Sequence, residues 1–157
     1  CCIWFQGCNL NCKGCCNKDL QALIPNHIVD FDKLVEIVKE ARDNFGIEGI
    51  TLSGGEPSLQ KGLIDFNKAI HDLGLGIIMF SGRSKDALNP ELVNSVDLLI
   101  DGPFIESELD IDRVLLGSKN KNLVFITDRY ESEVDYFNNP VSIEEITAED
   151  YIFINGD

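Results

Sequence analysis

All six cysteines of the chain lie within its first sixteen residues. Cys8, Cys12 and Cys15 follow a CxxxCxxC spacing, and Gly7 and Gly14 let this stretch turn back on itself. Thiolates are soft ligands that select zinc or an iron–sulfur cluster. A structural zinc site usually takes four protein ligands, and no second CxxC pair accompanies these three. The spacing therefore favours a 4Fe-4S cluster in which one iron lacks a protein ligand and is free to bind another molecule.

The remaining cysteines and the histidines have simpler interpretations. Cys1 and Cys2 adjoin a short strand predicted to be buried, where a free thiol behaves as a small hydrophobe. Cys16 directly follows a predicted ligand and could stand in for it. His27 and His71 sit singly, and we interpret both as ordinary surface or packing residues.

A second motif, GGEP at residues 54–57, follows a predicted strand. Gly54 and Gly55 expose a backbone that a ligand can approach closely, and the Glu56 carboxylate suits a cationic amino group. Ser53 and Ser81 each end a predicted strand and are candidates for polar contacts at the same place, although a serine there is more often a local cap.

Hydrophobic periodicity predicts the elements that position these motifs. A helix is expected from Asp30 to Gly46, a second from Ser58 to Gly74, and a short one at residues 89–90, where Asn and Pro occupy the cap and first-turn positions. Strands are predicted at residues 2–5, 48–53, 76–81, 97–101, 122–127 and 151–155.

This alternation of strands and helices implies right-handed crossover connections. It predicts an α/β fold with a mostly parallel sheet, arranged as a partial (β/α) barrel in a single domain spanning residues 1–157. In such folds the segments that follow the strands meet at the carboxyl edge of the sheet. The cysteine stretch and GGEP should therefore converge on one mouth.

With CxxxCxxC after the first strand and GGEP after the second, the chain resembles the radical S-adenosylmethionine superfamily. Within it, the chain is most similar to the activating enzymes of anaerobic ribonucleotide reductase. The matching segments, collinear over residues 2–121, are FQGCNLNCKGCCN, SGGEP, FSG, DLLIDGPF and LLGSKNK. Two positions depart from that family: Cys16 stands where an aromatic residue or His is common, and Leu116 where Arg is expected. These departures bear on the substrate and not on the cluster.

The resemblance implies a reaction and its cofactors. An external one-electron donor, such as a flavodoxin or ferredoxin, reduces a 4Fe-4S cluster bound by Cys8, Cys12 and Cys15. S-adenosylmethionine on the free iron is cleaved to methionine and a 5'-deoxyadenosyl radical, which takes hydrogen from a glycine of a large glycyl-radical enzyme subunit. Asp101 and Gly102 either receive the substrate loop or simply form a turn. The implied cofactor-binding residues are Gly14, Cys16, Ser53, Gly54, Gly55, Glu56 and Ser81.

Two other functions stay open. One is a radical S-adenosylmethionine enzyme that modifies a peptide or small molecule, which Leu116 and the unassigned residues 122–157 allow. The other is a non-catalytic iron–sulfur or zinc module that serves electron transfer or assembly.

The charge balance limits the partners. With 27 acidic and 13 basic residues the chain carries a net charge of -14, which disfavours nucleic acid and anionic membrane surfaces. Residues 101–157 hold 14 of the acids and 4 of the bases, as a solvated surface or a dock for a basic partner would. No apolar run reaches the ~18 residues of a membrane span.

Clustered cysteines argue against a disulfide framework, so a reducing cytoplasm is expected. Both ends of the sequence are expected to be trimmed.

Overall fold

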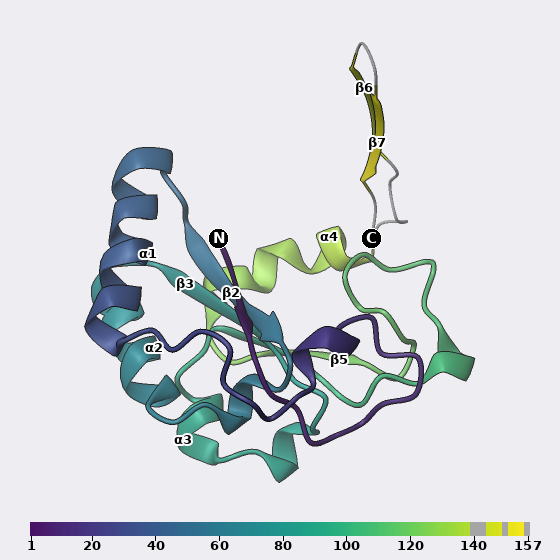
Figure 1. The fold of residues 1–157 in the computed structure, drawn as a ribbon, viewed down its shortest axis with the longest axis horizontal. Coiled ribbons are helices and arrows are strands. Elements are labelled where there is room, and N and C mark those ends of the chain that lie inside the picture. The colour runs from purple at the N-terminus through teal and green to yellow at the C-terminus, as the bar shows by residue number, and fades with distance from the viewer. Residues whose placement is uncertain (139–143, 149–150, 156–157) are drawn as a thin grey trace.

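The computed structural model describes residues 1–138, 144–148 and 151–155, with side chains for residues 1–138. A five-stranded sheet forms its centre, with the strands in the order β1-β2-β3-β4-β5 (Figure 1). The first four are parallel, and β5 is antiparallel to β4. The strands are β1 (Cys2–Phe5), β2 (Gly49–Gly54), β3 (Gly76–Phe80), β4 (Leu98–Asp101) and β5 (Asn122–Phe125). The prediction of a mixed α/β fold with a mostly parallel sheet is confirmed.

A second, two-stranded sheet lies near the end of the chain. It pairs β6 (Glu144–Ala148) antiparallel with β7 (Tyr151–Asn155), so the predicted strand at residues 151–155 is confirmed. No role is predicted from the sequence for residues 122–157. Of these, residues 139–143, 149–150 and 156–157 lie outside the described residues.

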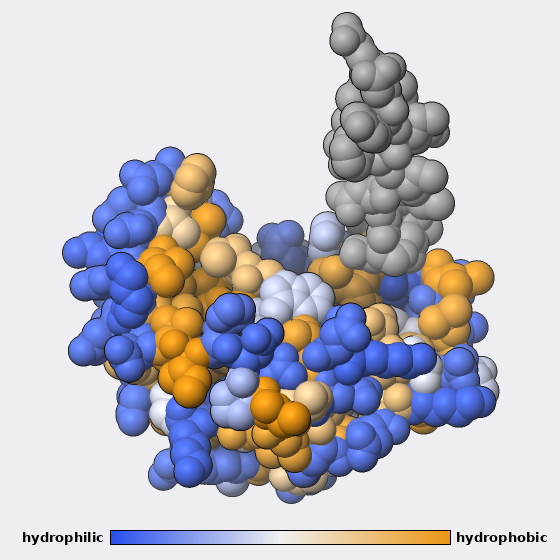
Figure 2. Space-filling view, in the orientation of Figure 1, coloured by the Kyte–Doolittle hydropathy of each residue, from blue (hydrophilic) through white to orange (hydrophobic). Residues whose placement is uncertain are grey.

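Helix α1 (Phe31–Phe45) forms where the periodicity predicts it. Gly46 ends it in the left-handed conformation at φ 64°, and its N–H donates to the Arg42 carbonyl. Asp30 occupies the N-cap position, but its side chain makes no capping hydrogen bond. Polar residues of α1 face outward, and apolar ones line the side turned toward the sheet (Figures 1 and 2).

Helix α2 (Leu63–Asp72) begins later than the sequence predicts. Ser58 instead belongs to a 3-10 turn over Pro57–Leu59, because its N–H donates to the Glu56 side chain. Gly62, at φ 79°, then reverses the chain before the helix starts. The short α3 (Pro90–Val93) forms as predicted, with the Asn89 side chain accepting from the Glu91 N–H.

The two faces of the sheet are covered differently. Helices α1, α2 and α3 pack on one face, and the core there comprises Val38, Phe66, Ile70 and Leu92 against Ile50, Leu52, Ile77, Met79 and Leu99. On the other face, Leu98 and Ile100 of β4 pack with Leu116 and with Phe137 of α4 (Val134–Phe137). Strand β1 is not buried as predicted: it is an edge strand, and Trp4 is 55% exposed. None of the helices in the described ranges is long and apolar enough to cross a membrane.

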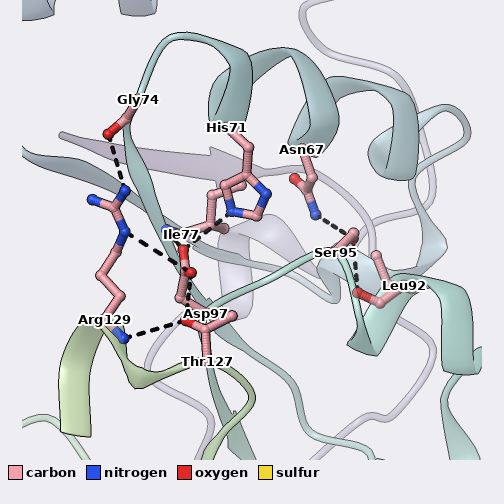
Figure 3. Close-up of polar contacts among 9 residues, drawn as sticks. All are labelled: Asn67, His71, Gly74, Ile77, Leu92, Ser95, Asp97, Thr127 and Arg129. Atoms are coloured by element: carbon pink, nitrogen blue, oxygen red, sulfur yellow. Dashed lines mark hydrogen bonds and ion pairs between the residues drawn. The ribbon is translucent and has the colours of Figure 1, made fainter.

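A polar network joins the elements at the amino edge of the sheet (Figure 3). The buried Asp97 carboxylate, at the start of β4, accepts from the Ile77 N–H at 2.8 Å and from the Thr127 hydroxyl at 2.7 Å, and lies 3.1 Å from His71 Nε2. Arg129 lies 3.9 Å from the same carboxylate and donates to the Gly74 carbonyl. His71, expected to be an ordinary packing residue, is thus part of a network that joins α2, β3, β4 and the segment after β5.

Candidate functional site

The predicted metal ligands lie on one closed loop after β1. Gly7 donates its N–H to the Leu20 carbonyl at 2.8 Å, and Cys8 donates to the Gln21 carbonyl at 3.0 Å. These two bonds draw the ends of the loop together at a narrow neck. Within the loop, the Cys15 N–H donates to the Cys12 carbonyl at 3.3 Å. Cys8, Cys12 and Cys15 are all half-buried.

The six thiols are all free, as a metal site requires. Cys1, Cys2 and Cys16 are exposed, so the expectation of buried thiols beside the first strand is wrong. Burial of part of its surface raises the pKa of the Cys2 thiol, although the positive N-terminus opposes this shift. Within the described ranges, no three His, Cys, Asp or Glu side chains are arranged to hold a metal ion. The donor set still fits an iron–sulfur cluster in type, because it offers three reduced thiols on one loop.

The GGEP segment lies directly against the neck of the cysteine loop. Phe5 of β1 pairs with Gly54 of β2, and beyond the strands the Gly55 N–H donates to the Phe5 carbonyl and the Glu56 N–H to the Gly7 carbonyl. A Cβ on Gly54 would lie 2.5 Å from the Phe5 nitrogen, and one on Gly55 would collide with the Gly7 carbonyl oxygen. The two glycines are therefore required by the close approach of the two chain segments.

Glu56 is 0% exposed and joins the ends of β2 and β3. One carboxylate oxygen accepts from the Ser58 hydroxyl at 2.6 Å, the Ser58 N–H at 3.2 Å and the Ser81 hydroxyl at 2.9 Å. The other accepts from the Gly82 N–H at 2.9 Å. Glu56 is expected from the sequence to accept a hydrogen bond from the amino group of a ligand. Its carboxylate already accepts hydrogen bonds from four donors of the chain itself.

The two candidate serines differ in what they contact. Ser81 is buried, donates to Glu56 and accepts from the Arg83 N–H at 3.0 Å. Ser53 is half-buried and lies opposite Trp4 in the β1–β2 register. Ser81 therefore has a structural role beside any contact with a ligand.

Asp101 and Gly102 form a turn at the end of β4. The Asp101 carboxylate accepts from the Lys85 N–H at 2.5 Å and from Asn122 Nδ2 at 2.8 Å, and Gly102 adopts φ 107°. The carbonyl of Gly102 accepts from Lys121 Nζ at 2.7 Å. Both hydrogen bonds of the Asp101 carboxylate are made to the chain itself. They agree with the expectation that Asp101 forms a turn and require no substrate loop.

The segment after this turn packs on the cysteine loop. Glu106 forms an ion pair with Lys13 at 3.0 Å, and a Cβ added to Gly14 would lie 2.8 Å from a Glu106 carboxylate oxygen. The Asn17 side chain donates to the Gly54 carbonyl at 3.1 Å, and Arg83 donates to the Asn9 side chain at 2.9 Å. The cysteine loop is thus held from the ends of β2, β3 and β4. Arg83 and Glu106 lie in segments that follow predicted strands, and Lys121 ends the matched segment LLGSKNK, but none of the three was singled out from the sequence as a site residue.

Three free thiols on one loop at the carboxyl edge of an α/β sheet suit an iron–sulfur protein, and the matched family agrees. A family described as the 4Fe-4S single cluster domain matches residues 1–124, and the chain belongs to that family. The chain is 29% identical over 132 residues to the anaerobic ribonucleoside-triphosphate reductase-activating protein of Escherichia coli (strain K12), covering 77% of this chain and 84% of that protein. The resemblance to the activating enzymes is confirmed.

Two longer proteins are also similar. A GTP 3',8-cyclase of Clostridium perfringens (strain SM101 / Type A) is 27% identical over 154 residues, 92% of this chain and 46% of that protein. An S-adenosylmethionine-dependent nucleotide dehydratase of Lacinutrix mariniflava (strain JCM 13824 / KCCM 42306 / AKS432) is 30% identical over 134 residues, 80% of this chain and 28% of that protein. The chain spans less than half of either protein.

Proposed function

We propose that the chain is a radical S-adenosylmethionine enzyme that generates a glycyl radical on a large partner such as anaerobic ribonucleotide reductase. The observation that carries this proposal is the junction of the two motifs, where Gly55 and Glu56 bond to the backbone at the start of the cysteine loop. The similarity to the reductase-activating protein, over 84% of its length, supports the choice of partner.

Cys8, Cys12 and Cys15 would hold the cluster. When bound, the 4Fe-4S cluster supplies one electron, and S-adenosylmethionine supplies the carbon–sulfur bond that this electron breaks. Gly14 and Cys16 flank the third ligand and would line the site. The chain itself positions these groups and limits the access of water to them.

The GGEP segment would hold the methionine end of S-adenosylmethionine. Since the Glu56 carboxylate is bonded to Ser58, Ser81 and Gly82, we assign it the task of fixing the backbone of Gly54 and Gly55, which would make the direct contacts. Ser53, half-buried on the face of the sheet opposite to α1, would supply a polar contact.

The architecture that suits this function is a partial (β/α) barrel in one domain spanning residues 1–157. The four parallel strands, with helices packed on one face, would form the first part of this barrel. The face over β1 and β2, with the exposed Trp4, would be its open inner side. An external one-electron donor, such as a flavodoxin or ferredoxin, and a reducing cytoplasm complete the proposal.

The test combines the anaerobically reconstituted chain with S-adenosylmethionine, dithionite and a large anaerobic reductase subunit. We expect about four irons per chain, cleavage of S-adenosylmethionine and a glycyl doublet in the electron paramagnetic resonance spectrum. Zinc without iron would instead indicate a non-catalytic module. Iron with cleavage but no doublet, for every reductase subunit tried, would exclude activation of these subunits.

The alternative, a radical S-adenosylmethionine enzyme that modifies a peptide or small molecule, loses one of the two observations that allowed it. Leu116, which stands where the activating enzymes carry Arg, is 0% exposed and packs in the same core cluster as Ile100 and Phe137. An apolar residue suits this position because Phe137, from the segment after β5, packs over the same face of the sheet. The change from Arg to Leu therefore does not require a different substrate.

A further inference from the structure

Lys121 lies at the same edge of the sheet as the cysteine loop, although it precedes a strand and the two predicted motifs follow strands. Because β5 is antiparallel to β4, the amino end of β5 lies at the edge where the parallel strands end. Lys121 immediately precedes β5, and its Nζ donates to the Gly102 carbonyl at 2.7 Å. The residue is half-buried.

The surrounding contacts connect Lys121 to the cysteine loop. The Asn120 side chain donates to the Pro103 carbonyl at 2.8 Å, and the Ile105 N–H to the Ser118 hydroxyl at 3.4 Å, so residues 102–105 are held against residues 118–121. The next residue in line, Glu106, packs against Lys13 and Gly14 of the cysteine loop. Lys121 therefore lies on a segment that is held, through residues 102–106, against the cysteine loop.

The charge of Lys121 is not neutralised by an adjacent carboxylate. Its ammonium group has three donors, and within residues 1–138 it takes part in no ion pair closer than 4.0 Å. Burial lowers the pKa of Lys121, and the negative charges of Cys12, Glu56, Asp101 and Cys16, when ionised, oppose that shift. The hydrogen bond to Gly102 places this ammonium at the end of β4, on the edge of the sheet that carries the cysteine loop.

The rest of the chain disfavours the arrival of an electron at this place. The net charge is -14, and the buried carboxylates of Glu56 and Asp101 lie at the same edge. Of two further cations at this place, Lys13 of the cysteine loop is paired with the Glu106 carboxylate, and Arg83 donates to the neutral side chain of Asn9. The reduction potential of an iron–sulfur cluster depends on the net charge and solvent exposure around it.

We propose that Lys121 is a positioning residue that acts through the cluster: its fixed positive charge stabilises the reduced state and raises the reduction potential. The inference rests on the proposed cluster at Cys8, Cys12 and Cys15. It concerns the equilibrium between oxidised and reduced cluster, so it is measured without a partner protein and without S-adenosylmethionine.

The test is a redox titration of the reconstituted full chain, followed by electron paramagnetic resonance. Lys121→Gln keeps a donor for the Gly102 carbonyl and removes the charge. We expect it to shift the reduction equilibrium about tenfold toward the oxidised cluster, a potential lower by about 59 mV for one electron. Lys121→Arg keeps the charge and should stay within about twofold of the wild type.

The matched control is Lys119→Gln, which removes a charge from the same segment at a side chain that is 60% exposed. Its potential should equal that of the wild type. An unchanged potential in Lys121→Gln, or equal shifts in the Lys119 and Lys121 variants, would overturn the inference. A Lys121→Gln variant that binds S-adenosylmethionine more weakly at unchanged potential would overturn it in favour of a carboxylate contact.

Failure of this inference differs from failure of the proposed function. A wild-type chain that takes up no iron refutes the proposed function. A wild-type chain that loads a cluster, with no dependence of its potential on residue 121, refutes the inference alone.

Discussion

At the scale of single residues, burial separates the predicted ligands from the other cysteines. Cys8, Cys12 and Cys15 are half-buried on the closed loop, whereas Cys1, Cys2 and Cys16 are exposed. A cluster that must pass an electron needs ligands shielded from bulk water, because exposure changes its potential and admits side reactions. Neighbouring thiols at positions 15 and 16 thus differ in their suitability, although the sequence makes them adjacent.

Replacing Cys12 by alanine should abolish iron uptake and S-adenosylmethionine cleavage while leaving the fold intact. Cys12 lies in a loop and contributes no side chain to either core cluster, so we expect the melting temperature of the apo form to change by less than about 3 °C. Iron content, cleavage after dithionite and thermal unfolding measure the three quantities. The control is Cys1→Ala, which should load and cleave as the wild type does. Cleavage retained in the Cys12 variant would show that this ligand assignment is wrong.

Glu56→Gln should reduce stability, because it replaces an acceptor oxygen by an NH2 group that faces protein donors. At 0% exposure the mismatch costs about 1–3 kcal/mol. Thermal unfolding of the apo form measures this loss, and calorimetry measures any accompanying loss of S-adenosylmethionine affinity.

Glu106→Gln is the control for Glu56, since it breaks an ion pair with the exposed Lys13, worth about 0–1 kcal/mol. A Glu56→Gln variant as stable as the wild type would contradict the structural role of this carboxylate. Loss of affinity at unchanged stability would then return Glu56 to the role of a direct ligand contact.

At the scale of elements, the sequence determines more of the parallel half of the sheet than of its end. The first four strands follow from short apolar runs between turn residues, and α1 follows from its 3.6-residue periodicity and the glycine that ends it. The direction of β5 depends on pairing with β4, which is a long-range contact that no local pattern encodes. The position of Lys121 at the mouth was missed for the same reason. The late start of α2 was missed because the Glu56 side chain caps a 3-10 turn at Ser58, and that side chain is itself held by hydrogen bonds from the distant Ser81 and Gly82.

The junction of the cysteine loop with GGEP gives a prediction about glycine. In Gly55→Ala, the new methyl group would collide with the Gly7 carbonyl, so the neck of the loop must open. We expect a loss of about 1–3 kcal/mol in stability together with reduced iron uptake. Both are measured on the same preparation, by thermal unfolding and by metal analysis.

Gly62→Ala provides the comparison for Gly55. Gly62 has a left-handed backbone at φ 79°, but nothing lies within 4 Å of an added Cβ. This variant should lose about 1–2 kcal/mol through backbone strain and still take up iron. If Gly55→Ala loads iron as fully as Gly62→Ala, the close approach of the two segments is not what positions the ligands.

At the scale of the whole molecule, the chemistry and the fastening of the fold lie at opposite edges of the sheet. The cysteine loop and GGEP lie at the carboxyl edge, and the Asp97 network lies at the amino edge (Figure 3). A cavity of about 530 Å³ near this network is lined by Arg42, Tyr130 and Glu133, among others, and by no cysteine. Loss of the network should therefore lower stability without altering the cluster loop directly.

Asp97 predicts how stability depends on pH. Burial raises its pKa, but the hydrogen bonds from Thr127, Ile77 and His71 outweigh burial and hold the pKa below its ordinary value. A carboxyl whose pKa is lower in the folded state contributes stability above its unfolded pKa of about 3.9 and loses it as pH falls through the folded pKa. Asp97→Asn should cost about 1–3 kcal/mol near neutral pH, and the difference from the wild type should shrink below about pH 4.

Urea unfolding of the apo form between neutral pH and about pH 3 measures this difference for Asp97→Asn, with Asp72→Asn as the control. Asp72 is an exposed acid at the end of α2, next to His71, and its replacement should leave the pH dependence of the wild type in place. A constant difference between Asp97→Asn and the wild type across the acid range would mean that the carboxylate charge is not what holds β3, β4 and the segment after β5 together. The hydrogen-bond geometry alone would then account for the network, because an amide at position 97 keeps one acceptor and loses the other.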